Sequence, residues 1–210
     1  MKGVFDEVAC RERLEAGVRQ LGIGMGREET EKLLRYLALL VKWNRAYNLT
    51  AVRDPLEMVT RHLLDSLAVL PYLQGRRCLD MGTGPGLPGI PLAVLRPQMA
   101  FVLLDANGKK IRFVRQAVLE LGLGNVEPVQ ARLERYRPAQ PFDLLISRAF
   151  TSLSRMLELS APLRGARTLL LAMKGDAERE LAEVGGCEAI PLQVPFVEAR
   201  RTLLRVPPGR

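Results

Sequence analysis

The amino-acid sequence predicts an α/β fold in which helices precede a doubly wound, mostly parallel sheet of seven strands. Residues 4–20, 28–45 and 55–70 carry apolar side chains at helical spacing, so three amphipathic helices come first. From residue 76 onward, short apolar runs alternate with helical stretches, which is the pattern of a parallel sheet with buried strands. Only about four to five residues separate the last two runs, too few for a crossover helix, so these strands form an antiparallel hairpin.

The boundaries of each element follow from local signals. The third helix opens with Asp54 as an N-cap, Pro55 at the first helical position and Glu57 at the third. We expect strands at 76–81, 100–105, 125–130, 142–147, 167–173, 188–195 and 200–206. Helices are expected at 88–95, 108–121, 151–160 and 176–184. Residues 1–72 form an N-terminal helical extension and residues 73–210 form the core, the two packed as one compact domain.

Composition limits the class of function. The 210 residues include 31 Lys and Arg against 23 Asp and Glu, a net charge of +8. This excess predicts an anionic partner, nucleic acid first and anionic lipid second, although genome composition or heat tolerance would also enrich arginine. No run of 18 apolar residues occurs and the N-terminus is charged, so we expect no membrane span or signal peptide and a cytoplasmic protein. Three scattered cysteines and one histidine predict neither disulfides nor a metal site.

The glycine-rich stretch LDMGTGPGLPGIPLAV at 79–94 matches two cofactor patterns. Residues 84–89 read G-x-G-x-x-G, the dinucleotide-binding pattern. Alternatively, the pattern starts at an acid and continues with alternating glycines: Asp80, Gly82, Gly84 and Gly86. In a doubly wound sheet both predict a cofactor at the carboxyl end of the first strand.

Three residues in this stretch favour the second pattern. Pro85 and Pro88 lack the N–H donors that a pyrophosphate would use, and the carboxylate of Asp80 would repel it. S-adenosylmethionine carries an amino group and no phosphate, so Asp80 or a backbone carbonyl can accept that group. Asp105, at the end of the second expected strand, can take two ribose hydroxyls of either cofactor. We therefore favour S-adenosylmethionine over NAD.

Five segments form a distinctive combination: KWNRAYNLTAVRDP (42–55), RHLLDS (61–66), DMGTGPGLPGIPLAVLRP (80–97), LLDANGKKIRFVRQ (103–116) and FDLLISRAF (142–150). They resemble the bacterial 16S ribosomal RNA guanine-N7 methyltransferases, also called the glucose-inhibited division protein B family, from about residue 30 to 205. The resemblance implies a class I, Rossmann-like methyltransferase fold. It also implies S-adenosylmethionine as the donor and a guanine in a decoding-region loop of 16S rRNA as the acceptor.

The resemblance also assigns residues to the donor. Gly82 and Leu87 would contact it, while Asp105, Ala106 and Asn107 would hold the ribose and border the adenine. Leu133 and Glu134 would flank the adenine ring. Arg148 is the position at which the cofactor and substrate sides meet, and we name it as the catalytic candidate.

The chemistry of guanine N7 fits the residues that end the fourth strand. N7 has an in-plane lone pair and no proton to lose, so proximity and alignment can carry the transfer without a general base. The strand ends in SRAF, without the Asn/Asp-Pro-Pro-aromatic signature of amine methylation and without a cysteine for attack on cytosine. Arg148 can bond guanine O6 or a phosphate, or stack on a base; it can also be an ordinary ion-paired arginine.

Further residues are candidates for RNA contact, each with a structural alternative. Lys109 and Arg112 share a helix face that can bind phosphates or simply be solvated, and Lys174 is a weaker candidate of that kind. His62 can wall the site or pack in the core. Asn44 and Tyr47 can read a flipped base or close a helix around Trp43.

The expected substrate is unpaired guanine, because A-form helices hide N7 in a deep major groove. We expect a monomer that acts on 16S rRNA, either free or within the 30S subunit. Two other functions stay open from the sequence: an NAD(P)-linked oxidoreductase, and a non-catalytic RNA-binding protein that retains the fold.

Overall fold

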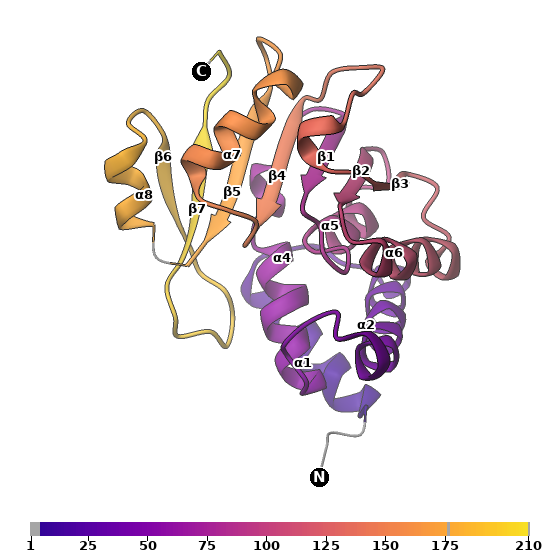
Figure 1. Ribbon diagram of the computed structural model, residues 1–210. Helices are drawn as coiled ribbons and strands as arrows, with labels where there is room; N and C mark the ends of the chain where they lie inside the picture. The colour runs from indigo at the N-terminus through magenta and orange to yellow at the C-terminus, as the bar shows by residue number, and fades with distance from the viewer. Residues whose placement is uncertain (1–4, 176, 210) are drawn as a thin grey trace.

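The computed structural model describes residues 5–175 and 177–209 (Figure 1). Its seven-stranded sheet has the order β3-β2-β1-β4-β5-β7-β6. The strands are β1 Arg77–Met81, β2 Ala100–Asp105, β3 Val126–Gln130, β4 Leu144–Arg148, β5 Leu169–Lys174, β6 Glu188–Leu192 and β7 Arg201–Val206. β7 runs antiparallel to both β5 and β6, and the other pairs are parallel. The predicted sheet with its antiparallel last hairpin is confirmed.

The expected helices are present. They are α1 Glu7–Gln20, α2 Arg27–Tyr47, α3 Pro55–Met58, α4 Asp65–Leu67, α5 Gly89–Leu95, α6 Gly108–Leu121, α7 Leu153–Ser160 and α8 Glu178–Glu183. Asp54 caps α3 by accepting a hydrogen bond from the backbone of Glu57 at 2.9 Å, as predicted. Residue 4 of the first expected helix and residue 176 of the last lie outside the described residues.

The third expected helix differs from a plain α-helix. Between α3 and α4 the chain forms a π-helical turn, Val59–Leu64, and a short 3₁₀ turn follows at Leu70–Tyr72. A π turn adds one residue per turn without changing the apolar character of the segment, so hydrophobic spacing did not reveal it. Such turns occur often at functional sites.

The sheet separates two apolar clusters. On one face Cys78, Leu103 and Ile146 belong to a core that also contains buried apolar side chains from α1, α2, α5 and α6. On the other face Leu79 and Leu145 pack in a second core with residues of α7. The alternation along β1 and β4 is that of strands buried on both faces. The N-terminal helices thus share one core with a face of the sheet.

The N-terminal helices lie below the strand ends in Figure 1, where β4 and β5 point toward α4. Helix α2 packs against α5 and α6. The hydroxyl of Tyr36, a fully buried side chain, donates to the backbone carbonyl of Pro85 at 2.8 Å. This bond joins α2 to the glycine-rich loop, so the N-terminal helices form a wall around the carboxyl ends of the strands.

Asn44 holds the segment that follows α2. Its side chain is buried, its Nδ2 donates to the carbonyl of Val52 at 3.1 Å, and its Oδ1 accepts from the backbone of Thr50 at 2.9 Å. Trp43 packs against Phe113, with ring centroids 5.7 Å apart. Of the two roles open to Asn44, the structural one is favoured, because its amide already bonds the backbone of residues 50 and 52.

We expect Asn44→Ala to lower the free energy of unfolding by about 2 kcal/mol, because it leaves buried backbone groups of residues 50 and 52 unpaired. Urea denaturation followed by the fluorescence of Trp43, the single tryptophan, measures this change. The exposed neighbour Arg45 provides the control, and Arg45→Ala should stay within about 0.5 kcal/mol of the wild type. Equal stabilities of the two variants would contradict the prediction.

Candidate functional site

The loop between β1 and α5 has the geometry that only glycine adopts easily. Gly82, Gly84 and Gly86 have φ values of 70°, 60° and 94°, in the left-handed region. A Cβ on Gly82 would lie 2.3 Å from the ring of Phe150, whereas a Cβ on Gly84 would meet nothing within 4 Å. The loop therefore packs closely under Phe150, whereas at Gly84 the space that a side chain would fill is empty.

Asp80 holds this loop from inside the protein. Its side chain is fully buried, and its Oδ2 accepts from the Thr83 hydroxyl at 2.6 Å and from the Gly89 backbone at 2.9 Å. Burial raises the pKa of Asp80 to about 7, although these two hydrogen bonds oppose the shift. The pleat of β1 turns Asp80 toward α5, and its carboxylate does not line the hollows described below. Of the two acceptors considered for an amino group, the geometry therefore favours a backbone carbonyl of the loop over the carboxylate of Asp80.

Asp105 connects the loop to the next strand. Its Oδ2 accepts from the backbone of Gly84 at 2.9 Å, and its Oδ1 accepts from the backbone of Asn107 at 2.8 Å. Each carboxylate oxygen has a second lone pair for a further donor. The side chain of Asn107 caps α6 by accepting from the backbone of Lys109 at 2.9 Å. The carboxylate of Asp105 is therefore fixed at the carboxyl end of β2 and can still accept hydrogen bonds from hydroxyl groups.

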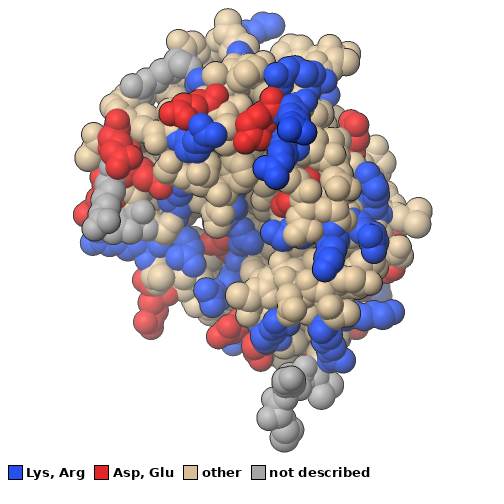
Figure 2. Space-filling view, viewed as in Figure 1, with Lys and Arg blue, Asp and Glu red and all other residues tan. Residues whose placement is uncertain are grey.

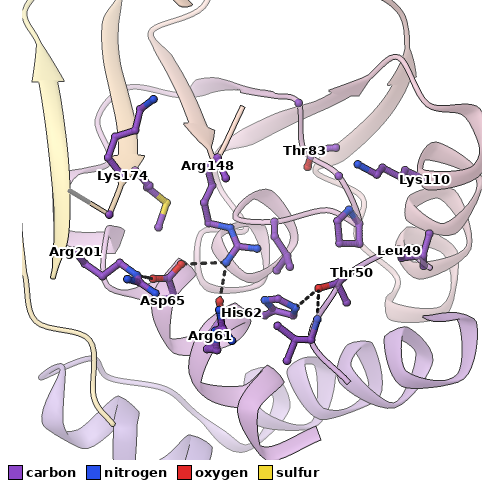
Figure 3. A pocket seen from close by; sticks show the side chains of 18 of the residues that line it. Leu49, Thr50, Arg61, His62, Asp65, Thr83, Lys110, Arg148, Lys174 and Arg201 are labelled. Atoms are coloured by element: carbon purple, nitrogen blue, oxygen red, sulfur yellow. Dashed lines mark hydrogen bonds and ion pairs between the residues drawn. The ribbon is translucent and has the colours of Figure 1, made fainter. Parts of the chain in front are cut away.

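Two neighbouring hollows open at the carboxyl ends of the strands. The first hollow, of about 390 Å³, lies between the glycine loop, the π-helical turn and the ends of β4 and β5 (Figure 3). The second hollow, of about 330 Å³, lies beyond the end of β2. Gly82, Lys110 and Ala149 line both. A single elongated ligand can therefore occupy one hollow and extend into the other.

The second hollow combines apolar walls with carboxylates. Leu104, Leu133 and Phe150 supply apolar surface, while Asp105 and Glu134 supply acceptors. Such a lining suits a flat heteroaromatic ring that has polar edges and an attached diol.

His62 lies in the wall of the first hollow. It is 5% exposed, its Nε2 is 2.9 Å from the hydroxyl of Thr50, and its Nδ1 has no hydrogen-bond partner among the described residues. Burial, aided by the nearby charge of Arg148, lowers the pKa of His62 to about 4. The imidazole is therefore neutral near pH 7.

A cluster of charged side chains lines one wall of the first hollow. Asp65 binds Arg148 through Oδ2 at 3.0 Å and Arg201 through Oδ1 at 2.9 Å. Arg148 also donates to the carbonyl of Arg61 at 2.7 Å. The guanidinium of Arg61 itself lies 3.9 Å from the carboxylate of Glu57. The catalytic candidate Arg148 thus lies in the first hollow, held by a carboxylate from α4.

The comparisons with known proteins agree with this geometry. The family described as rRNA small subunit methyltransferase G matches residues 29–204. The chain belongs to this family. It is 53% identical over 199 residues to the ribosomal RNA small subunit methyltransferase G of Methylococcus capsulatus, which covers 93% of the chain and 97% of that relative. It is 54% identical over 203 residues to the protein of the same name from Chromohalobacter salexigens, with coverages of 94% and 97%.

Solved structures support the class I methyltransferase fold. A putative O-methyltransferase from Klebsiella pneumoniae superposes with a TM-score of 0.61 at 15% identity, covering 93% of this chain and 96% of its own. A SAM-dependent methyltransferase from Aquifex aeolicus gives a TM-score of 0.51 at 18% identity, with coverages of 69% and 90%. The family and fold predicted from the sequence are therefore confirmed, and the methyltransferase interpretation is favoured over an oxidoreductase.

The residues that the resemblance assigns to the donor are divided between the two hollows. Gly82, Asp105, Ala106, Leu133 and Glu134 line the second hollow. Gly82, Gly84, Leu87 and Arg148 line the first. Gly86 and Asn107 line neither, and their roles are local: a left-handed turn and a helix cap.

The basic residues considered for RNA contact do not all lie where we expected them. The ammonium of Lys174 binds Glu180 at 2.9 Å and the carbonyl of Thr151, and Figure 3 shows it turned away from the centre of the first hollow. Lys109 and Arg112 are exposed on α6 and line neither hollow. Lys110, which the sequence did not single out, lines both. Lys110 and Lys109 are alike in sequence, and only the direction in which α6 turns each side chain distinguishes them.

Tyr47 also lies outside the two hollows. It is 40% exposed and packs on Trp43, with ring centroids 5.2 Å apart.

In the part of the chain that the structure describes, no helix is long and apolar enough to cross a membrane, and no group of three metal-ligating side chains is found.

The lowered pKa of His62 predicts how its contribution to stability depends on pH. Between pH 6.5 and about 4 the unfolded chain binds a proton at this histidine and the folded chain does not. The contribution is therefore complete above the unfolded pKa and is lost as pH falls. We expect the stability difference between wild type and His62→Gln to change in favour of the variant by about 3 kcal/mol over this range.

Urea denaturation at a series of pH values measures this difference. Asp80, whose raised pKa gives the opposite slope, is present in both proteins and cancels in the comparison. A pH-independent difference would show that the folded protein protonates His62 as readily as the unfolded chain does.

Proposed function

We propose that this methyltransferase transfers the methyl group of S-adenosylmethionine to N7 of a guanine in a decoding-region loop of 16S ribosomal RNA. The observation that carries the proposal is the pair of joined hollows, one suited to an adenosine and the other bordered by Arg148 and His62. The name of the matching relatives supports small-subunit rRNA as the substrate class. The sequence segments that resemble guanine-N7 methyltransferases support the acceptor atom.

In this proposal the second hollow holds the adenosine end of the donor. Asp105 accepts the two ribose hydroxyls with the lone pairs that its backbone contacts leave free. Leu133 and Ala106 border the adenine, and Glu134 accepts from its amino group. The methionine end lies over the bare backbone at Gly84, where loop carbonyls accept the ammonium group. Asp80 supports the donor indirectly by holding the loop.

The residues of the first hollow match a reaction that removes no proton. The N7 lone pair forms a bond to the methyl carbon as the carbon–sulfur bond breaks. The bonding pair stays on sulfur, and the positive charge passes to the guanine. His62 is neutral and hydrogen-bonded, and the reaction needs no base from it. Alignment of donor and acceptor supplies the rate enhancement, and the transfer needs no metal ion.

Positive charge around the site would bind the RNA. Lys and Arg side chains gather on the face in Figure 2, over the N-terminal helices and beside α6. In our proposal Lys110 contacts the RNA at the junction of the hollows, and Lys109 and Arg112 contact phosphates farther along α6. The acceptor is unpaired, and the enzyme acts as a cytoplasmic monomer on 16S rRNA, free or within the 30S subunit.

Labelled S-adenosylmethionine incubated with 16S rRNA and with 30S subunits tests the proposed reaction. We expect the label in 7-methylguanosine at one decoding-region position. Nuclease mapping and nucleoside chromatography identify the product. Label on adenine or cytosine would refute the proposed acceptor. RNA binding without any transfer would instead favour the non-catalytic alternative.

We expect Asp105→Ala to weaken S-adenosylhomocysteine binding about 10- to 100-fold, because it removes charged hydrogen bonds to the ribose. Isothermal titration calorimetry measures the affinity. Glu12, an exposed acid on α1, provides a control of equal charge change, and Glu12→Ala should bind like the wild type. Tight NADH binding by the wild type, with no response to S-adenosylhomocysteine, would restore the oxidoreductase alternative.

A further inference from the structure

Asp65 occupies an unusual position between two arginines. It follows the π-helical turn, its side chain is 6% exposed, and each oxygen binds a guanidinium from a different strand. Arg148 comes from the end of β4 and Arg201 from the start of β7. All three side chains line the first hollow (Figure 3). Asp65 thus joins three elements that are distant in the sequence at one point of the site.

Stability alone does not account for this cluster. Removing a carboxylate and two guanidinium groups from water costs free energy that their attraction often fails to recover. Apolar side chains of similar volume would commonly stabilise the same space as well. A cluster placed in the wall of a substrate hollow is better explained by what it does to a group that reaches the substrate.

The contacts of Arg148 show what the cluster does. Its Nη1 donates two hydrogen bonds, one to Asp65 and one to the carbonyl of Arg61 in the π turn. Among the described residues, Nη2 and Nε of Arg148 make no hydrogen bond. Figure 3 shows the second terminal nitrogen directed away from Asp65, toward the centre of the hollow. The guanidinium is therefore fixed on one side and has free donors on the other.

We propose that Asp65 is a positioning residue, which holds Arg148 through Nη1 so that its remaining N–H groups address the acceptor base. Arg201 fixes the orientation of Asp65 in turn. This inference rests on the proposed function, because it assumes that a base enters the first hollow beside Arg148.

The pairing also suits the charge that moves during the reaction. Methyl transfer places a positive charge on the base, and an uncompensated arginine beside it would raise the energy of that state. The carboxylate 3.0 Å from Nη1 offsets part of the charge of Arg148. Asp65 thus lets Arg148 offer directional donors while opposing the developing cation less.

Single-turnover and steady-state kinetics on the RNA substrate test the proposal. We expect Asp65→Asn to lower kcat about 10- to 100-fold through misplacement of Arg148. The affinity for S-adenosylhomocysteine should stay within about twofold, because the carboxylates proposed to bind its adenosine, Asp105 and Glu134, lie in the second hollow. Arg148→Lys should lose nearly as much as Arg148→Ala, because the three N–H groups of an ammonium share one nitrogen, and a nitrogen held at Asp65 cannot also reach the base as the second arm of a guanidinium does.

A double-mutant cycle separates positioning from a merely structural role. In an Arg148→Ala background, Asp65→Asn should cost no further kcat, because its effect acts through the missing guanidinium. Equal losses in both backgrounds would overturn the proposal, as would a wild-type kcat for Asp65→Asn.

Where Asp65→Asn fails to fold, Arg201→Gln gives the same test, since it loosens Asp65 but keeps the carboxylate. Its smaller kcat loss should likewise vanish in the Arg148→Ala background, and an undiminished loss there would overturn the proposal. Arg205→Gln is the matched control on the same strand, where an exposed arginine pairs with Glu188 at 3.4 Å, and it should leave kcat unchanged.

The identity of the product distinguishes this proposal from the proposed function. If the wild type methylates another atom, the proposed acceptor fails, while the cycle still reports whether Asp65 acts through Arg148. If the wild type forms 7-methylguanosine and the cycle is additive, only the positioning role fails.

Discussion

The site depends on one buried carboxylate, Asp80, which holds the glycine loop in shape from beneath. Its bonds to Thr83 and Gly89 fix both ends of a loop whose glycines otherwise have ample conformational freedom. The loop then supplies the Gly84 N–H that binds Asp105, which orients the carboxylate at the end of the neighbouring strand. Both hollows share this loop, so an acid that faces neither of them determines the geometry of each.

The N-terminal helices complete the site from the opposite side. Tyr36 bonds the loop at Pro85, and the π-helical turn brings His62, Asp65 and the Arg61 carbonyl to the strand ends. These helices share an apolar core with the sheet, so their polar residues hold fixed positions relative to it. A methyltransferase sheet alone would lack the carboxylate that binds Arg148. Helices that precede the sheet in the sequence therefore supply one wall of the site.

The sequence predicted the parts of the site that depend on strand ends and failed where tertiary partners decide. Apolar runs place the strands, and a parallel sheet brings Asp105 and the Leu133–Glu134 segment to one edge. Alternate side chains of β1 point to opposite faces of the sheet, and this alternation determines whether Asp80 faces a ligand. The rotation of α6 about its axis determines that Lys110, and not Lys109, faces the hollows. Lys174 and Asn44 look available in sequence, but Glu180 and the 50–52 backbone occupy them.

The proposed reaction moves a positive charge between the two hollows, and the charged residues that line them determine the electrostatic cost of that movement. In the proposal the donor side is lined by Asp105 and Glu134 together with Lys110 and Arg132, while Arg148 and Arg201 lie on the acceptor side with one carboxylate between them. Transfer neutralises the sulfonium and makes the base cationic, so the positive charge moves toward the two arginines, and the carboxylate of Asp65 limits the electrostatic cost of that step. Before transfer the positive charge of the arginines favours the binding of RNA, because the base is still neutral and the RNA backbone is anionic. Afterwards their residual positive charge repels the methylated base and so favours its departure.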